Sequence, residues 1–209
     1  MKFYNLKLTL SSLCLAILAT IYVELHREPE VVIKTQIEYK EMPLEIEKKV
    51  FYLYKDLQKY NHLDDLTKVK ISKYIVKYAE KYNINYKLLY SVLWRETRFR
   101  HNILHKPTYI KSLDKTIQAK GIGGIVCEYW CEKLKLEKII SNENDLLKLE
   151  NGIESSAFVL SYYKSLGKQE NYTLEESMLN RYYGKPVKKY YKTILNKKQS
   201  IEKQILALN

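Results

Sequence analysis

The sequence predicts a mainly α-helical protein, and three observations support this prediction. The chain has only six glycines and four prolines in 209 residues, so tight turns are few and long helices are favoured. Apolar residues recur at spacings of three and four in most segments after residue 43. The alternation of valine and threonine that is typical of strands is scarce. With 46% hydrophobic residues, the chain can build one folded domain and a helical appendage.

Residues 1–25 are predicted to direct the chain to a membrane. Lys2 and Lys7 precede an uncharged apolar run, Leu8 to Val23, which is long for a signal-peptide core and short for a full span. No clean small-x-small cleavage site follows, and Leu13 before Cys14 does not suit a lipoprotein signal. We therefore expect an uncleaved signal-anchor, with export and cleavage as the alternative. The leading lysines orient the rest of the chain outward.

The remaining chain divides into a linker with a helical stalk (26–62), a folded domain (63–198) and a C-terminal helical tail (199–209). Periodicity predicts helices over 44–60 and 67–82, followed by a helix that Asn85 caps. Residues 100–120 contain Pro107 and many polar side chains, so an irregular segment is expected there. Further helices are predicted over 128–140, 151–163 and 174–179, and a last one begins near Pro186.

Glu96 is the candidate catalytic residue. It follows Leu89, Val92 and Leu93 at helical spacing, so its carboxyl group shares their apolar stripe. Desolvation disfavours the charged form of a carboxyl group and raises its pKa. A raised pKa suits a group that donates a proton near neutral pH.

A structural role is the alternative for Glu96. Arg95, Arg98 and Arg100 are close in sequence, and an ion pair with any of them would also perturb the carboxyl group. A guanidinium of Arg98 directed at Glu96 would lower the pKa that acid catalysis needs raised.

Three of the six glycines are concentrated at Gly121, Gly123 and Gly124. Such a loop takes unusual backbone dihedrals or approaches a ligand closely. A tight connection between helices is the alternative, but it needs only one glycine. No Gly-Lys-Ser/Thr ending follows, which excludes a phosphate-binding loop.

Two residue pairs with a spacing of four bear on metals and redox chemistry. Cys127 and Cys131 would form a disulfide only in an oxidising compartment, and a regular helix strains that bond, so we expect two small core residues. Without a second pair they form no zinc site. His101 and His105 lack the glutamate that a zincin motif has after its first histidine, since Asn102 stands there. We predict no metal site.

The net charge of +12 indicates an anionic partner: nucleic acid, an acidic membrane surface or an acidic polymer such as bacterial cell wall. The export segment argues against nucleic acid, and the lysines show no aromatic-interleaved fingerprint of RNA-binding domains. Many of the 20 tyrosines neighbour lysines. We expect most to be core residues with a solvated hydroxyl, and a surface that stacks on sugars or bases is the alternative.

Four short motifs occur in order along the chain: Glu96–Phe99, Ala119–Gly124, Gly152–Leu160 and Arg181–Gly184. Together they resemble the motifs of the lysozyme-like lytic transglycosylases, which cleave bacterial peptidoglycan. The resemblance covers Ile71 to Leu195.

Some positions depart from the pattern of that family. Thr97 stands where its first motif has serine, and Gly124 stands where its second has glutamine. The tyrosine and asparagine of its fourth motif align with Tyr182 and Tyr183, and a shift by one would give the tyrosine role to Tyr183. These departures leave open an altered specificity.

The resemblance implies a goose-type lysozyme or soluble lytic transglycosylase fold that acts on peptidoglycan glycan strands. Glu96 would be general acid and then base, forming 1,6-anhydro-N-acetylmuramic acid without a cofactor or a fixed second carboxylate. Gly121, Gly123 and Gly124 would offer backbone donors to the glycan, and Tyr182 (with Tyr183) would lie near Glu96 and the sugar. The implied location is the bacterial periplasm or cell envelope, with residues 8–23 in the inner membrane. A non-catalytic wall-binding or assembly protein on the same scaffold is the alternative.

Overall fold

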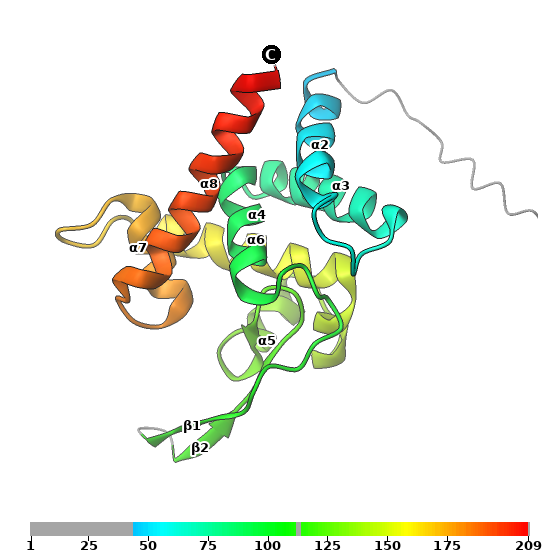
Figure 1. Cartoon of the computed structure of the whole chain (residues 1–209). Coiled ribbons are helices and arrows are strands. Elements are labelled where there is room, and N and C mark those ends of the chain that lie inside the picture. Colours follow the sequence, from blue (N-terminus) through cyan, green and yellow to red (C-terminus); the bar gives the residue numbers. More distant parts are fainter. Residues whose placement is uncertain (1–43, 112–113, 209) are drawn as a thin grey trace, which may run out of the picture. The chain divides into compact units, whose positions relative to one another are not determined.

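The computed structural model describes residues 44–111 and 114–208, and it confirms a mainly helical protein (Figure 1). Seven α-helices occur in this part of the chain, with two short antiparallel strand pairs and a 3-10 helix, Glu143–Leu147, between α5 and α6. The helices are α2 (Leu44–Leu57), α3 (Asp65–Lys81), α4 (Tyr86–Thr97), α5 (Cys127–Leu136), α6 (Leu149–Ser165), α7 (Leu174–Tyr183) and α8 (Lys188–Leu208).

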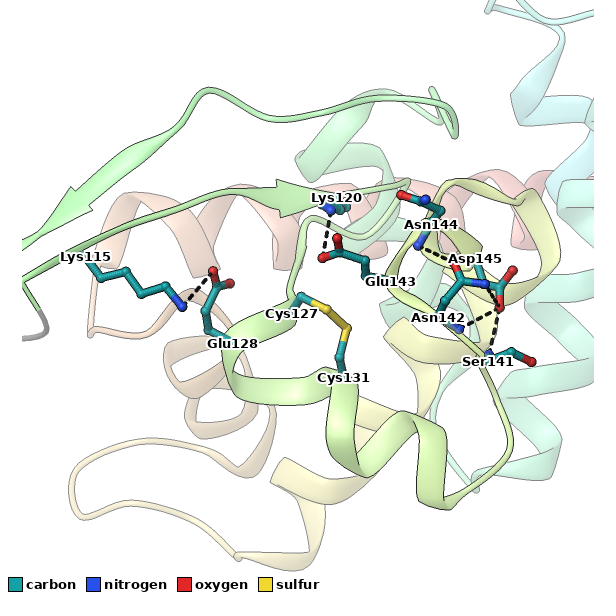
Figure 2. The surroundings of a disulfide bond; sticks show 10 residues. All are labelled: Lys115, Lys120, Cys127, Glu128, Cys131, Ser141, Asn142, Glu143, Asn144 and Asp145. Atoms are coloured by element: carbon teal, nitrogen blue, oxygen red, sulfur yellow. Dashed lines mark hydrogen bonds and ion pairs between the residues drawn. A yellow bond between two sulfur atoms is a disulfide. The ribbon is translucent and has the colours of Figure 1, made fainter.

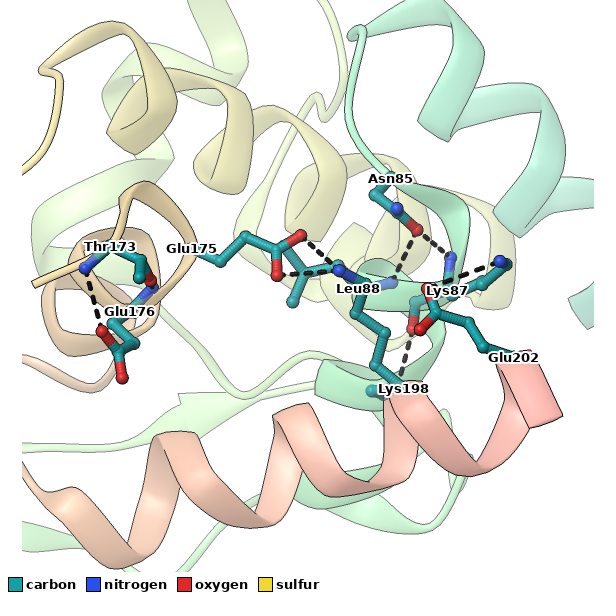
Figure 3. Close-up of polar contacts among 9 residues, drawn as sticks. Asn85, Lys87, Leu88, Thr173, Glu175, Glu176, Lys198 and Glu202 are labelled. Atoms are coloured by element: carbon teal, nitrogen blue, oxygen red, sulfur yellow. Dashed lines mark hydrogen bonds and ion pairs between the residues drawn. The ribbon is translucent and has the colours of Figure 1, made fainter.

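Helix α4 lies inside the fold, in contact with α3, α6 and α8 (Figure 1). Its apolar stripe is confirmed, since Leu89, Val92 and Leu93 are fully buried. The predicted cap is also confirmed: the Asn85 side chain accepts from the backbone N–H of Lys87 and Leu88 at 2.9 and 3.3 Å (Figure 3). The capped first turn and the buried apolar stripe fix the position and rotation of α4, and therefore the direction in which its last turn faces.

The segment expected to be irregular, residues 100–120, contains three of the four short strands of the described residues. β1 (Thr108–Ile110) pairs with β2 (Lys115–Ile117), and β3 (Ala119–Lys120) pairs with β4 (Ile125–Val126), both antiparallel. The β1–β2 hairpin extends away from the helices (Figure 1). Runs of two or three residues are too short to show the alternation that identifies a strand.

The helical stalk and tail expected at the two ends both join the main body. Leu53 and Leu57 of α2 are buried in the same core as α4. Helix α8 runs unbroken past residue 198, where a boundary was expected, and buries Ile201 in that core. The ion pair between Glu175 of α7 and Lys198, at 2.7 Å, fastens α8 where the tail would begin (Figure 3).

The predicted membrane segment, residues 8–23, and the linker after it lie outside the described residues. In the part of the chain that the structure describes, no helix has the length and apolar character needed to cross a bilayer.

Lysine–tyrosine neighbours on α3 have a structural role. Lys77 and the Tyr78 hydroxyl both bond Glu150 of α6, at 2.8 and 2.6 Å. One turn later, Lys81 and the Tyr82 hydroxyl bond Glu154, at 2.5 and 3.1 Å. At these two positions the tyrosine hydroxyl is bonded to a carboxylate, so the pairs join α3 to α6.

Cys127 and Cys131 form a disulfide, so the expectation of two unbonded core residues is wrong (Figure 2). Their Cα atoms are 4.7 Å apart, within the range that a disulfide spans. Cys127 is the first residue of α5, and a residue at a helix end can approach the next turn more closely than one in the middle. The bond therefore closes the first turn of α5.

Candidate active site

Glu96 lies in the last turn of α4, with its side chain partly buried. Burial raises the pKa of its carboxyl group above the usual value, while the hydroxyl of Tyr190 and the charge of Arg95 act in the opposite direction. The raised pKa agrees with the expectation from the apolar stripe.

Tyr190 fixes one oxygen of this carboxyl group. Its hydroxyl donates a hydrogen bond to Oε1 of Glu96 from the start of α8. Tyr190 is only 3% exposed, and burial, together with the charge of Glu96, raises the pKa of its hydroxyl well above the usual value. The hydroxyl is therefore a permanent donor at neutral pH, and Oε2 is the oxygen left for chemistry.

Sequence analysis did not single out Tyr190 as a site residue. It belongs to a buried stripe with Tyr191 and Ile194, and a buried tyrosine needs a partner for its hydroxyl. The sequence therefore indicates that this hydroxyl needs a partner. It does not show that the partner is Glu96, which lies 94 residues away.

Arg98 points away from Glu96. It ends α4 in the left-handed conformation, with φ of 55°, and its guanidinium lies over the ring of Trp94, 3.9 Å from the centroid. Of the three arginines that could have paired with Glu96, Arg98 is therefore not its partner. Arg95 acts on the carboxyl group through its charge, which lowers the pKa of Glu96.

Gly124 brings the glycine loop against Glu96. A Cβ atom added at Gly124 would lie 2.9 Å from Oε2 of Glu96 and 3.2 Å from Cε1 of His105. The backbone there has φ of +62°, which side chains other than glycine rarely adopt. The hydroxyl of Thr97 donates to the carbonyl of Ile122 at 2.9 Å, which ties the loop to the end of α4.

The other two glycines of the loop serve packing. A Cβ at Gly121 would lie 1.9 Å from the carbonyl oxygen of Leu146, and one at Gly123 would lie 1.8 Å from the Ser156 hydroxyl. Lys120, beside Gly121, pairs with Glu143 at 2.9 Å and holds the loop to the 3-10 helix (Figure 2).

The backbone donors expected from this loop are largely used within the protein. The N–H of Gly121 donates to the carbonyl of Ile103 at 2.9 Å, and that of Gly124 donates to Gly121 at 3.1 Å. These two N–H groups therefore already have acceptors within the protein. The loop instead brings its backbone close to Glu96 at Gly124.

Neither Tyr182 nor Tyr183 makes the expected bond to Glu96, which Tyr190 makes instead. The hydroxyl of Tyr182 donates to the carbonyl of Gly123 at 2.7 Å, so it holds the loop and does not bond Glu96. Tyr183 is 46% exposed, and its ring stacks on that of Tyr190 with centroids 4.3 Å apart.

A groove of about 840 Å³ lies beside Gly124 and both tyrosines. Its volume is typical of ligand sites. Aromatic side chains line it on several elements, and rings of this kind suit the apolar faces of sugars. They are Tyr129 and Trp130 of α5, Tyr163 of α6, and Tyr182 and Tyr183 of α7.

The charged side chains of the groove are basic. Lys106, Arg181 and Lys185 line it together with His105, and the described lining residues include no aspartate or glutamate. Glu96 is not itself a lining residue, but its Oε2 lies against Gly124, which lines the groove. A carboxyl group that could donate a proton is therefore next to this basic, aromatic groove.

Among the residues that the structure describes, no three His, Cys, Asp or Glu side chains lie together where they could hold a metal ion. His105 lines the groove, whereas His101 is not part of the lining.

Comparisons of the chain with protein-family models, with curated proteins and with solved structures give no match. The interpretation of the site therefore depends on its own geometry.

Proposed function

We propose that this protein is a peptidoglycan lytic transglycosylase with a lysozyme-like helical domain. The main support is the environment of Glu96. Burial raises the pKa of its carboxyl group, Tyr190 bonds Oε1, and Oε2 lies against Gly124, next to the ring of His105. A carboxyl group in this state is protonated over a wider pH range than an exposed one, as a general acid requires.

The reaction uses Glu96 twice. Its protonated carboxyl group donates a proton to the oxygen that joins N-acetylmuramic acid to N-acetylglucosamine, and that bond breaks. The resulting carboxylate accepts the proton of the muramic 6-hydroxyl, whose oxygen attacks the anomeric carbon and closes the 1,6-anhydro ring. Because the attacking group belongs to the substrate, no second carboxylate is needed to activate water.

The lining of the groove supports a cell-wall substrate. Exposed aromatic rings such as Tyr129 and Tyr183 offer surfaces for sugar rings. Lys106 and Lys185, both exposed, offer positive charge to an acidic polymer. With the apolar run at residues 8–23 as a signal-anchor, the domain would act in the periplasm or cell envelope.

The test is digestion of purified sacculi by the full chain, with mass spectrometry of the soluble products. The wild type is expected to release muropeptides that end in 1,6-anhydro-N-acetylmuramic acid, and Glu96→Gln is expected to release none. Glu128→Gln is the matched control, since Glu128 precedes the groove residue Tyr129 on α5 but pairs with Lys115 at 3.6 Å (Figure 2). This control should retain full activity.

Failure of the wild type to release any anhydro product would contradict the proposal. The non-catalytic alternative, a wall-binding protein, would then be tested by sedimentation of the full chain with sacculi. Equal activity of Glu96→Gln and wild type would exclude the role given to Glu96.

A further inference from the structure

We propose that His105 is a substrate-binding residue, which accepts a hydrogen bond from the sugar that lies beside Oε2 of Glu96. The inference rests on the proposed function only in taking the ligand to be a glycan of the cell wall. It assigns a role to a side chain that the mechanism above does not use.

The backbone around His105 is held in place. The N–H of His105 donates to the carbonyl of Ala119 at 2.9 Å, and its own carbonyl accepts from the side chain of Gln118 at 2.8 Å. Both partners belong to the segment that leads into the glycine loop. His105 is therefore positioned by the same structure that positions Gly124.

The imidazole of His105 and the carboxyl group of Glu96 lie against the same face of Gly124. A Cβ built at Gly124 would be 3.2 Å from Cε1 and 3.4 Å from Nε2 of His105, and 2.9 Å from Oε2 of Glu96. Gly124 and His105 both line the groove. A sugar bound in the groove at Gly124 would therefore lie close to His105 and to Oε2.

One ring nitrogen of His105 is assigned by its partner. Nε2 is 3.3 Å from the carbonyl oxygen of Gly121, and because a carbonyl only accepts, Nε2 carries the hydrogen. In the neutral ring Nδ1 is then an acceptor. Within the described residues no group donates to Nδ1, and His105 lines the groove. A sugar hydroxyl or the N–H of an acetamido group would supply that hydrogen bond.

The experiment measures binding separately from cleavage. The ligand is the peptide-free tetrasaccharide of alternating N-acetylglucosamine and N-acetylmuramic acid, and binding to full-length Glu96→Gln is measured by calorimetry. Adding His105→Ala should weaken binding about ten-fold, as expected for one lost hydrogen bond. His105→Gln, whose amide oxygen can accept, should recover part of this loss.

His101→Ala is the control, because His101 lies outside the groove lining. It should bind the tetrasaccharide as tightly as its Glu96→Gln parent. With Glu96 present, His105→Ala should raise KM more than it lowers kcat, since a contact made equally in ground and transition states affects KM. A general loss of structure would not raise KM more than it lowers kcat, and His105→Gln would not restore binding.

The outcomes separate the two proposals. If the chain binds the tetrasaccharide in a His105-dependent way but releases no anhydro product, the inference stands and the lyase activity does not. If the wild type cleaves sacculi, and a folded His105→Ala variant binds and cleaves as well as the wild type, the inference is overturned and the lyase activity stands. Absence of any binding to Glu96→Gln would also overturn the inference.

Discussion

The hydroxyl of Tyr190 bonds Glu96 and favours its carboxylate form, which lowers a pKa that burial has raised. The proposed reaction needs the protonated acid, so activity should fall as pH rises through the pKa of Glu96 in the folded protein. Tyr190→Phe removes the donor, and the falling limb of the profile of kcat/KM against pH should move to higher pH. The shift expected from one hydrogen bond is about one pH unit or less.

Tyr191→Phe is the control for this measurement. Tyr191 neighbours Tyr190 on α8 and is almost as buried, but its ring packs against Tyr172, at 6.2 Å between centroids. Its profile should match the wild type. A limb that stays in place, or moves to lower pH, in Tyr190→Phe would show that the hydroxyl does not stabilise the carboxylate.

Gly124 is expected to tolerate no side chain. Gly124→Ala would push against Oε2 of Glu96 and the ring of His105, and a misplaced catalytic group can cost about 100-fold in kcat. Gly167→Ala is a matched control, because Gly167 also has a positive φ, of +71°, but nothing lies within 4 Å of its Cβ position. Both variants should lose roughly 1–2 kcal/mol of stability from backbone strain.

Steady-state kinetics on sacculi and urea unfolding of both variants measure these effects. Only Gly124→Ala should lose activity. Similar kcat values for the two variants would mean that the close approach of the loop to Glu96 has no catalytic consequence.

The disulfide supports the helix that forms one side of the groove. It closes the first turn of α5, whose Tyr129 and Trp130 line the groove. A Cys127→Ala/Cys131→Ala double variant should lose about 2 kcal/mol in the free energy of unfolding, the value for a very short loop in the chain-entropy model. KM for sacculi should also rise, since the aromatic wall is less fixed.

Urea unfolding with and without a dithiol reductant measures the contribution of this disulfide. The reduced wild type should match the double variant, which no reductant should affect further. Equal unfolding free energies for oxidised wild type and double variant would contradict a stabilising disulfide.

The elements that the sequence predicted well are those in which the helical spacing of apolar residues repeats over a long segment. Helices over residues 44–60, 67–82 and 151–163 correspond to α2, α3 and α6, because ten or more residues repeat the helical spacing. The β1–β2 hairpin and the cysteine pair were predicted wrongly, since three-residue strands have too few alternations and the geometry of a helix end is not visible in the spacing of two cysteines.

The candidate site was predictable only where its features are local. Glu96 lies on an apolar stripe that the sequence displays, and the clustering of glycines indicates a close approach. The bond from Tyr190, and the use of the Gly121 and Gly124 N–H groups inside the protein, depend on partners that only the fold brings together.

At the scale of the whole molecule, Asp56 joins three helices. Its side chain, on α2, is 1% exposed and accepts from Tyr90 of α4 at 2.5 Å and from Lys197 of α8 at 2.7 Å. Burial alone would raise its pKa, but the bonds from Lys197, Lys59 and Tyr90 outweigh burial, and the pKa of Asp56 lies below its usual value. The carboxylate therefore stabilises the fold above the unfolded pKa of 3.8, and this contribution is lost as pH falls.

Asp56→Asn should lower the free energy of unfolding by about 3 kcal/mol at pH near 7, because it leaves buried Lys197 without its counter-charge. This loss of stability should become smaller in acid, where the protonated aspartate of the wild type is neutral, as asparagine is. Asp65→Asn is the control: that side chain is 73% exposed, and its pair with Lys68 should contribute about 0–1 kcal/mol. Urea unfolding at neutral and acidic pH tests this, and equal losses for the two variants would contradict the role of Asp56.

In the proposed reaction, Glu96 acts without a second carboxylate and without water as the attacking group. The decisive experiment is digestion of sacculi by the full chain in water enriched in oxygen-18, followed by mass spectrometry of the products. We predict anhydro-muropeptides that carry no heavy oxygen, and no products from Glu96→Gln. Muropeptides with a reducing end that has taken up one heavy oxygen would contradict the account, because they would show that water attacks the bond.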